Sequence, residues 1–265
     1  MFETKNRIEV VGKVKNFKIK ELGSGKKMAT IGIKDEKKNN YVNVSLFERD
    51  GMKYGSKDDL KDVTLNSLKK VFLGSDDKAK DVLVTAVGST SDYTNEEGKT
   101  YSNNTVFSLY PCDDEEKQKA TFNLQGIAEV ISTLQDENDE DYLKIRVATV
   151  SVVGKENDKR ITGVNYKTVV VRDSKLVDDL SDAAKGDLVS LKGYIINILP
   201  ERDEFGDLIG QGRQEYEVVK GSIVKEADEI DEEDLALYKK AKKLKTGESI
   251  VLKAKAKDDD EDFED

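Results

Sequence analysis

The sequence predicts a mainly β protein made of two successive sets of five strands, with a short helix near the C-terminus. Three observations support this fold class. Short apolar runs alternate with polar residues at the period of a half-buried strand, and turn-forming residues separate them. The same order of runs occurs before and after the charged stretch 113–119. One helical pattern, at 174–184, interrupts the second set of strands.

The first five strands are expected within residues 1–112. Period-two alternation places Ile8, Val10 and Val14 on one face of the opening strand, which continues after a bend through 16–22. The polar stretch between the third and fourth strands predicts a helix at 57–60 and a short strand at 71–73. The five strands themselves are predicted at 7–14, 28–34, 41–47, 81–89 and 105–110.

Residues 120–225 repeat this plan after the charged linker 113–119. Gly126 has the place in the sixth strand that Gly12 has in the first. Polar excursions at 92–104 and 201–213 separate the last two strands of each set, which predicts two long hairpins. The strands of the second set are predicted at 121–130, 142–149, 166–172, 188–198 and 216–224.

The C-terminal part departs from the repeat. Within residues 226–257, the segment 229–245 has acids in its first turn and lysines in its last, which suits a helix dipole. The segment 249–255 is consistent with a short strand or coil. Residues 258–265 read DDDEDFED, with seven acids and no base, and such a density of like charge predicts a disordered acidic tail.

The composition excludes several classes of chemistry. The chain has no histidine and one cysteine, so a Ser-His-Asp triad, a Cys-His pair and a zinc site built on His or several Cys are excluded. The net charge is −10, but the tail holds seven of the 54 acids, which leaves 47 acids against 44 Lys and Arg in residues 1–257. No apolar run reaches the length of a membrane span, and the N-terminus does not read as a signal peptide. We therefore expect a cytoplasmic protein that needs no cofactor.

The stretch 165–199 resembles a known family. It reads NYKTVVVRDSKLVDDLSDAAKGDLVSLKGYIINIL: a strand, a short helix with Leu176 and Leu180 at helical spacing, a Lys185-Gly186-Asp187 turn, and a strand that contains a glycine. This order is similar to the passage from the third to the fourth strand of bacterial single-stranded DNA-binding proteins. The resemblance implies two tandem OB-folds, which are five-stranded barrels that bind oligonucleotides on one face.

The resemblance also implies a function. Members of this family bind single-stranded DNA without sequence preference during replication, recombination and repair, and they are not enzymes. Their acidic tails recruit partner proteins, and the matching residues here are Asp258, Asp259, Asp260, Asp262 and Phe263. The bacterial tip ends in Pro-Phe, whereas Phe263 is followed by Glu264 and Asp265, which suits a phage-encoded relative in a host cytoplasm. Two barrels in one chain would reduce the need for a tetramer, so we expect a monomer or small homo-oligomer.

Candidate DNA contacts follow from the alternation of each strand, because a single strand needs ring faces for its bases and cations for its phosphates. On the third strand, Val42, Val44 and Leu46 are expected to point inward, with Tyr41, Asn43, Ser45 and Phe47 outward. The same register places Tyr166, Thr168, Val170 and Arg172 outward on the eighth strand. The predicted DNA-binding residues are Lys13, Lys15, Lys34, Tyr41, Phe47, Tyr93, Lys99, Tyr101, Lys144, Arg146, Tyr166, Arg172, Arg202 and Arg213.

Other interpretations remain open at this point. Outward aromatic residues can cap a barrel end, exposed cations can form weak surface ion pairs, and long hairpins can be solvated loops without a ligand. One alternative function is a structural or protein-interaction module of tandem β-domains in a virion or scaffold. Another is a carboxylate-metal nuclease, which would need acids gathered in a cleft, whereas the acids here crowd into loops, linker and tail.

Overall fold

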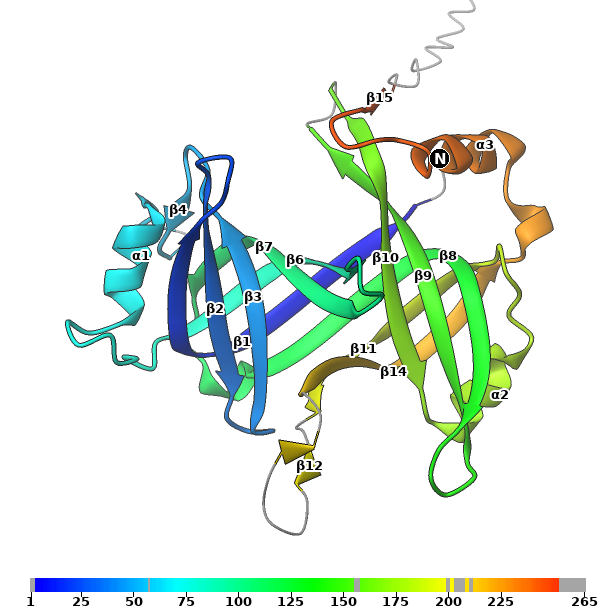
Figure 1. Ribbon diagram of the computed structural model, residues 1–265, viewed down its shortest axis with the longest axis horizontal. Coiled ribbons are helices and arrows are strands. Elements are labelled where there is room, and N and C mark those ends of the chain that lie inside the picture. The colour runs from blue at the N-terminus through cyan, green and yellow to red at the C-terminus, as the bar shows by residue number, and fades with distance from the viewer. Residues whose placement is uncertain are drawn as a thin grey trace, which may run out of the picture.

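The protein is mainly β, with two groups of strands that lie side by side (Figure 1). The computed structural model describes residues 3–252, apart from 57, 155–157, 199–200, 203–207 and 210–211; the side chains at 201, 202, 208 and 209 are also outside the description. The strands are β1 (Lys5–Glu21), β2 (Lys27–Asp35), β3 (Asn40–Phe47), β4 (Lys53–Tyr54), β5 (Lys61–Asp62), β6 (Leu83–Thr94), β7 (Thr100–Pro111), β8 (Lys119–Gln135), β9 (Asp141–Val153), β10 (Arg160–Val171), β11 (Leu188–Ile198), β12 (Glu201–Arg202), β13 (Leu208–Ile209), β14 (Arg213–Lys225) and β15 (Ile250–Val251). The helices are α1 (Leu65–Phe72), α2 (Ser174–Ser181) and α3 (Glu232–Ala241), with single 3₁₀ turns η1 (Glu115–Lys117) and η2 (Ala227–Glu229).

The strand pairings close two rings of five strands each. In the first ring, β1 pairs with β2, β2 with β3, β3 in parallel with β7, β7 with β6, and β6 with β1. In the second ring, β8, β9, β10, β14 and β11 pair in the same order, again with one parallel contact, between β10 and β14. We call these rings barrel 1 and barrel 2.

The two barrels are joined through one antiparallel pairing of their first strands. The register of β1 and β8 runs from Lys5 opposite Gln125 to Val11 opposite Lys119. Buried residues of both barrels therefore belong to one continuous core, which includes Val42, Val44 and Leu46 on the face predicted for them. This shared sheet fixes how the barrels lie relative to each other.

The repeat is visible in backbone detail. A Cβ atom at Gly12 would lie 2.4 Å from the carbonyl oxygen of Lys34, and one at Gly126 would lie 2.2 Å from that of Ala148. Because only glycine permits such an approach, both first strands cross the second strand of their barrel closely. Each glycine is followed by an irregularity in register, between Val14 and Asn16 in β1 and between Ala128 and Val130 in β8.

The helix predicted at 57–60 is wrong at 58–60, which are not helical, while 57 lies outside the described residues. The strand predicted at 71–73 is also wrong, because 71 and 72 belong to a helix and Leu73 makes only an isolated bridge with Ala79. The helix of barrel 1 is α1. Thr64 caps it, accepting a hydrogen bond from the amide of Ser67, whose hydroxyl accepts one from the amide of Thr64. Leu65, Leu68 and Phe72 form its buried face at helical spacing. The helix predicted at 174–184 is confirmed as α2, and Gly186 follows it with φ +107°.

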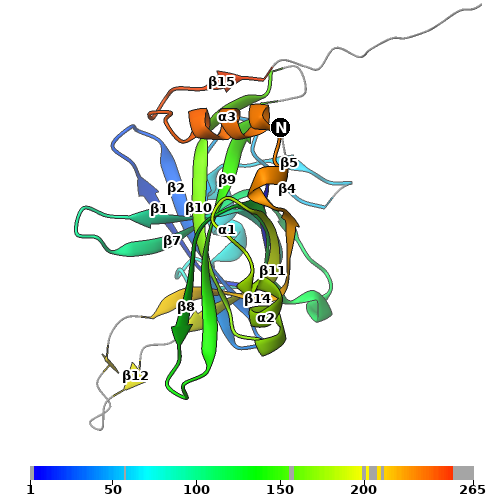
Figure 2. The ribbon, with the colours of Figure 1, turned by 90° about the vertical axis from the view of Figure 1, so that its right-hand side faces the viewer.

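The C-terminal helix is confirmed as α3, although it is shorter than the segment 229–245. The helix lies close to the upper ends of β9 and β10 (Figure 2), and β15 pairs with the start of β10. Tyr238 and Ala241 are its buried residues, and they pack in a cluster with Ala148 of β9. None of the described helices is long and apolar enough to span a membrane.

Candidate nucleic-acid interface

A groove of about 670 Å³ lies between the two barrels. Its walls come from β3, the β6–β7 hairpin, β9, β10 and the start of β14, so residues far apart in sequence meet there. Three of the predicted DNA-binding residues, Tyr101, Lys144 and Arg213, line this groove. Asn43 of β3 and Thr168 of β10 also line it, and these two residues face the second strand at equivalent places in their barrels. The groove therefore lies where the outer faces of the barrels meet.

The floor of the groove contains a buried ion pair between the barrels. Lys167 of β10 is 2% exposed, and its Nζ lies 2.7 Å from Asp92 Oδ1 and 2.6 Å from Ser102 Oγ, both on the β6–β7 hairpin. Asp92 Oδ2 accepts a hydrogen bond of 2.7 Å from the amide of Thr168, and Lys167 Nζ lies 3.5 Å from the ring centre of Tyr216. Burial lowers the pKa of Lys167 to about 8, although the neighbouring Asp92 carboxylate acts in the opposite direction. The pair holds the hairpin of barrel 1 against barrel 2.

Neutral hydrogen bonds extend this contact. The buried Tyr216 of β14 donates its hydroxyl to Asn104 Oδ1 and accepts a bond of 3.0 Å from the Thr90 hydroxyl, both in barrel 1. A reciprocal contact joins β3 of barrel 1 to β11 of barrel 2. Asn40 of β3 donates a hydrogen bond to the carbonyl of Ile195 and accepts one from the amide of Asn197. The fourth strand of each barrel thus contacts the third strand of the other, and the groove has a rigid base.

The β6–β7 hairpin projects its tyrosines into solvent. Tyr93 and Tyr101 face each other across the hairpin, and they are 62% and 47% exposed. Lys99 lies at the tip, where its Nζ is 3.4 Å from Glu97. Exposed rings of this kind are available for stacking against bases.

The outer face of barrel 1 carries further candidates. Tyr41 is half-buried because its ring lies across Gly32, where a Cβ atom would come within 1.8 Å of the Tyr41 hydroxyl. Asn16 Nδ2 donates to that hydroxyl, and burial raises the pKa of Tyr41. Phe47 is 38% exposed, and Lys34, directly opposite Tyr41, is half-buried.

Sequence reasoning did not single out Lys18 and Lys20 on this same face. Both are exposed, and they lie opposite Thr30 and Met28 of β2. Within the described residues, neither lysine has an ion pair, and the same is true of Lys34. The signal was present, since the continuation of the first strand through 16–22 was expected and its alternation could have been extended to these lysines.

Lys13 and Lys15 lie on the outside of β1 as expected, but carboxylates surround them. Lys13 Nζ is 2.8 Å from Glu36 and 3.1 Å from Glu115, and Lys15 Nζ is 2.9 Å from Glu36 and 2.8 Å from Asp81. The two lysines hold the pKa of Glu36 at about 2. Their charge is largely compensated locally, so they contribute less positive potential than Lys18, Lys20 and Lys34.

On barrel 2, helix α3 reduces the open area of the corresponding face. Tyr166 is half-buried beside the α3 cluster, and the Arg146 guanidinium lies 4.5 Å from its ring centre. Lys144 and Arg146 remain exposed, with Lys144 Nζ 5.8 Å from the ring centre of Tyr142. Val170 was predicted to point outward, but it is not accessible to a ligand. It is only 4% exposed, because the hairpin of barrel 1 approaches it.

The remaining predicted residues differ in their surroundings. Arg172 forms an ion pair with Glu215, which raises the pKa of Arg172, and Arg213 lies 3.6 Å from the same carboxylate. Arg202 belongs to β12, but its side chain is outside the described residues. The tail residues Asp258, Asp259, Asp260, Asp262 and Phe263 lie outside the described residues as well. In the part of the chain that the structure describes, no group of three or more acidic or cysteine side chains could hold a metal ion.

Comparison with known proteins supports the fold. No protein-family model matches this chain, and no curated protein matches its sequence. Among solved structures, the wild-type single-stranded DNA binding protein from Thermus aquaticus is similar with a TM-score of 0.51 at 13% identity, covering 84% of this chain and 94% of that chain. A deletion mutant of that protein gives a TM-score of 0.48 at 14% identity, with coverage of 88% and 100%. The mitochondrial single-stranded DNA binding protein Rim1 from S. cerevisiae gives 0.31 at 14% identity, with coverage of 41% and 99%.

At 13% identity, the likeness to the Thermus aquaticus protein establishes a similar fold and nothing finer. It extends over most of both chains, so it includes both barrels of this one. The resemblance that stretch 165–199 gave from sequence is thereby confirmed at the level of structure: the chain is similar in fold to a single-stranded DNA binding protein.

Proposed function

We propose that this chain binds single-stranded DNA through two tandem OB-folds, without catalysing a reaction. The observation that carries the proposal is the continuous face formed by the outer side of β2–β3, the groove between the barrels and the outer side of β9. Exposed rings and cations without compensating carboxylates lie along this face, although the chain as a whole is acidic. Stacking surfaces beside cations are the arrangement that a flexible, sequence-independent strand requires.

In this proposal, the DNA backbone follows cations on both barrels. Lys18, Lys20 and Lys34 neutralise phosphates on barrel 1, and Lys144 and Arg146 do so on barrel 2. Tyr93, Tyr101 and Phe47 offer ring faces to the bases. The buried contacts beneath the groove keep the two halves of this surface in a fixed relation, which reduces the entropy lost on binding.

The finer assignments are part of the same proposal. The domains would be an OB-fold at 1–112, a linker at 113–119, a second OB-fold at 120–225, a helical segment at 226–257 and the acidic tail at 258–265. The tail would recruit replication or recombination proteins through its acids and Phe263, in the cytoplasm of a cell or of a phage host. The protein would act as a monomer or small homo-oligomer.

The direct test is a fluorescence-anisotropy titration of labelled oligo-dT at several salt concentrations. We expect the logarithm of the affinity to fall with the logarithm of salt at about −0.7 per phosphate contact. Tyr101→Ala should weaken binding by about 1–3 kcal/mol, the value of one base-stacking contact. Tyr110→Ala is the matched control, since Tyr110 is an exposed tyrosine of the same strand that does not line the groove.

A second pair of variants tests the cations. Lys144→Ala should reduce the salt slope by roughly one phosphate contact, whereas Lys175→Ala on the exposed side of α2 should leave it unchanged. Absence of binding at micromolar protein would reject the proposal and leave a structural or protein-interaction module. Magnesium-dependent cleavage of the oligonucleotide would instead indicate a nuclease.

The tail has its own test. Removing residues 258–265 should leave oligo-dT affinity equal or higher, because a negative segment no longer competes for the cationic face. The truncated protein should lose polymerase, helicase or recombinase partners in pull-downs from a lysate. Retention of the same partners would contradict the recruiting role while leaving DNA binding intact.

A further inference from the structure

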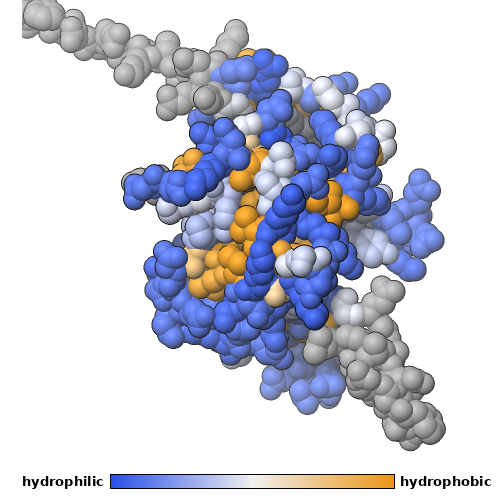
Figure 3. All heavy atoms as spheres, turned by 90° about the vertical axis from the view of Figure 1, so that its left-hand side faces the viewer, coloured by the Kyte–Doolittle hydropathy of each residue, from blue (hydrophilic) through white to orange (hydrophobic). Residues whose placement is uncertain are grey.

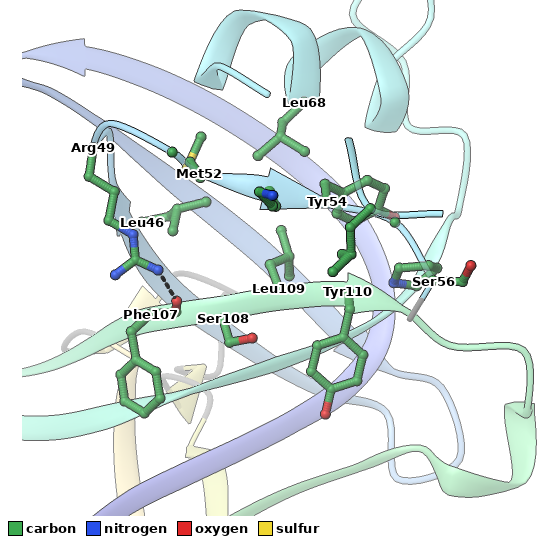
Figure 4. Close-up of a pocket in the computed structure, with 15 residues that line it drawn as sticks. Leu46, Arg49, Met52, Tyr54, Ser56, Leu68, Phe107, Ser108, Leu109 and Tyr110 are labelled. Carbon is green, nitrogen blue, oxygen red and sulfur yellow. Dashed lines mark hydrogen bonds between the residues drawn. The ribbon is translucent and has the colours of Figure 1, made fainter. Parts of the chain in front are cut away.

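Barrel 1 has a second cavity, on the side away from the groove. It has a volume of about 620 Å³ and lies between α1, the β4–β5 hairpin and β7. The face over α1 has apolar side chains grouped in its middle and hydrophilic ones around them (Figure 3). Leu46, Met52, Tyr54, Leu68 and Leu109 converge in this cavity (Figure 4). The rings of Phe107 and Tyr110 point away from it on the other side of β7.

The cavity exists because the two helices pack differently. In barrel 2, a Cβ atom at Gly221 of β14 would lie 3.0 Å from Leu180 of α2, so the missing side chain lets this helix pack directly on the strand. In barrel 1, Leu109 has the equivalent place on β7. Leu109 lies three positions after Val106, which is opposite Gly88, and Gly221 lies three positions after Val218, which is opposite Gly193. Helix α1 packs instead toward β1 and β2. The opening beside β7 is therefore not filled by the helix.

The second half of β7 has one free edge along this cavity. Strand β3 pairs with β7 only at Thr105 and Val106. From 108 to 111, β7 pairs with β6 on one side, and no described strand pairs with it on the other. The carbonyl of Phe107 accepts a hydrogen bond from Arg49 Nη2, so a side chain occupies the place of a neighbouring strand there. An open strand edge is a template for an added strand.

Two cationic side chains line the cavity. Arg49 and Lys53 are the charged residues among those that line it, both are exposed, and neither has an ion pair within the described part of the chain. An apolar floor, two lining cations and an open strand edge together favour an extended segment with acidic residues and one large apolar side chain.

We propose that this site binds an acidic peptide segment of a partner protein, which adds as a strand along residues 108–111 and inserts a leucine or phenylalanine side chain above Leu46 and Leu109. The peptide's backbone bonds the free edge of β7, and its carboxylates pair with Arg49 and Lys53. A nucleobase fits less well, because the exposed rings next to the cavity face away from it. This site is separate from the proposed DNA path, so the two can be occupied together.

The test uses the full chain and two labelled ten-residue peptides in fluorescence anisotropy. One peptide alternates Glu and Asp with Leu and Phe, and the other carries Lys in place of every acid. We expect the acidic peptide to bind and the basic one not to bind. The double variant Arg49→Glu, Lys53→Glu should weaken the acidic peptide at least tenfold, while Lys175→Glu, an exposed lysine on α2 of barrel 2, should change it less than twofold.

Hydrogen exchange then identifies the position of binding. The acidic peptide should slow exchange of the amides of 108–110 without changing those of 5–11, which are already paired between β1 and β8. Met52→Trp, which fills the cavity floor, should abolish binding while oligo-dT affinity stays near that of the parent. Equal binding of both peptides, protection elsewhere, or protection of 108–110 by oligo-dT instead would each overturn the proposal.

Discussion

Tyr41 and Tyr166 have the same place in the two barrels but different surroundings. Tyr41 lies opposite Lys34 of β2, and Tyr166 lies opposite Ala148 of β9. The carbonyls of Lys34 and Ala148 are those that closely approach the glycines of the first strands. In barrel 1, the hydroxyl end of the Tyr41 ring lies against Gly32, and Asn16 donates a hydrogen bond to this hydroxyl. In barrel 2, Arg146 takes the place of this glycine and lies over the ring of Tyr166. One position is thus held by a hydrogen bond and the other by a cation–π contact.

The comparison extends to the faces around the two rings. Lys34, which has no ion pair among the described residues, lies directly opposite Tyr41, whereas Tyr166 lies beside α3, which buries Ala148 completely. Tyr238 of α3 donates to Glu129 of β8, and Lys242 Nζ lies 2.8 Å from the same carboxylate, so the helix is tied to the barrel it covers. A duplicated fold has therefore kept its backbone geometry while one face stayed open and the other became partly covered.

Two of the contacts between the barrels differ in kind, one charged and one neutral, and the largest expected effect follows from the charged one. One contact is the buried Lys167–Asp92 pair, and the other is the neutral bonding of Asn40. Lys167→Met should lower the free energy of unfolding by about 3–5 kcal/mol, because Asp92 would remain buried without its counter-charge. Urea unfolding followed by circular dichroism measures the change.

The control for that prediction is the double variant Lys167→Met, Asp92→Leu. It removes both charges, so its free energy of unfolding should return close to that of the parent. A single variant as stable as the parent would show that the charges do not hold the hairpin against barrel 2.

The same lysine predicts a pH dependence of stability. Its pKa is lowered from 10.5 to about 8 in the folded protein, so between these pH values the unfolded chain binds more protons at this site than the folded one does. The contribution of Lys167 to the free energy of unfolding should therefore rise with pH from about 8 to 10.5, with a slope of at most about 1.4 kcal/mol per pH unit. The difference between the parent and the double variant, measured across this range, isolates the contribution. A difference that is flat or falls with pH would contradict it.

Gly32→Ala tests the packing of Tyr41. The added Cβ atom would overlap the tyrosine hydroxyl, so the ring must leave its place and the bond from Asn16 is lost. We expect a loss of about 1–3 kcal/mol in unfolding free energy. In the double variant Gly32→Ala, Tyr41→Ala, the alanine at 32 should add almost no further cost to that of Tyr41→Ala alone. An equal cost with and without the ring would mean that the strain comes from the backbone of β2.

Much of the fold was predictable from sequence, because period-two alternation assigns strand faces directly. Val42, Val44 and Leu46 are buried as expected, and the helix at 174–184 was recognisable from Leu176, Leu180 and Gly186. Helix α1 was missed because its capping box uses Ser67 in place of the usual Glu or Gln, and its first turn has no acid. A polar sequence around an eight-residue helix carries little signal on its own.

The candidate site was less predictable, because burial across the barrels depends on contacts that no local pattern encodes. Sequence reasoning gave no role to Lys167, which is buried against Asp92 in a hairpin of the other barrel. The compensation of Lys13 and Lys15 depends on Glu36, Asp81 and Glu115, which the fold alone brings together. Alternation predicts the direction of a side chain, but it gives no information about which other segment meets it.

The smallest effect is expected at the neutral contact. Asn40→Ala removes the bonds to the Ile195 carbonyl and the Asn197 amide, and the partly exposed site admits water as a replacement, so the loss should be about 0.5–1.5 kcal/mol. Asn103→Ala, an exposed asparagine on β7, should change the free energy of unfolding by less than half of that. If Asn40→Ala were as costly as Lys167→Met, the two reciprocal contacts would stabilise the pair of barrels equally. The charged contact would then have no special part in fixing the groove, and the difference between the two barrels would be confined to their outer faces.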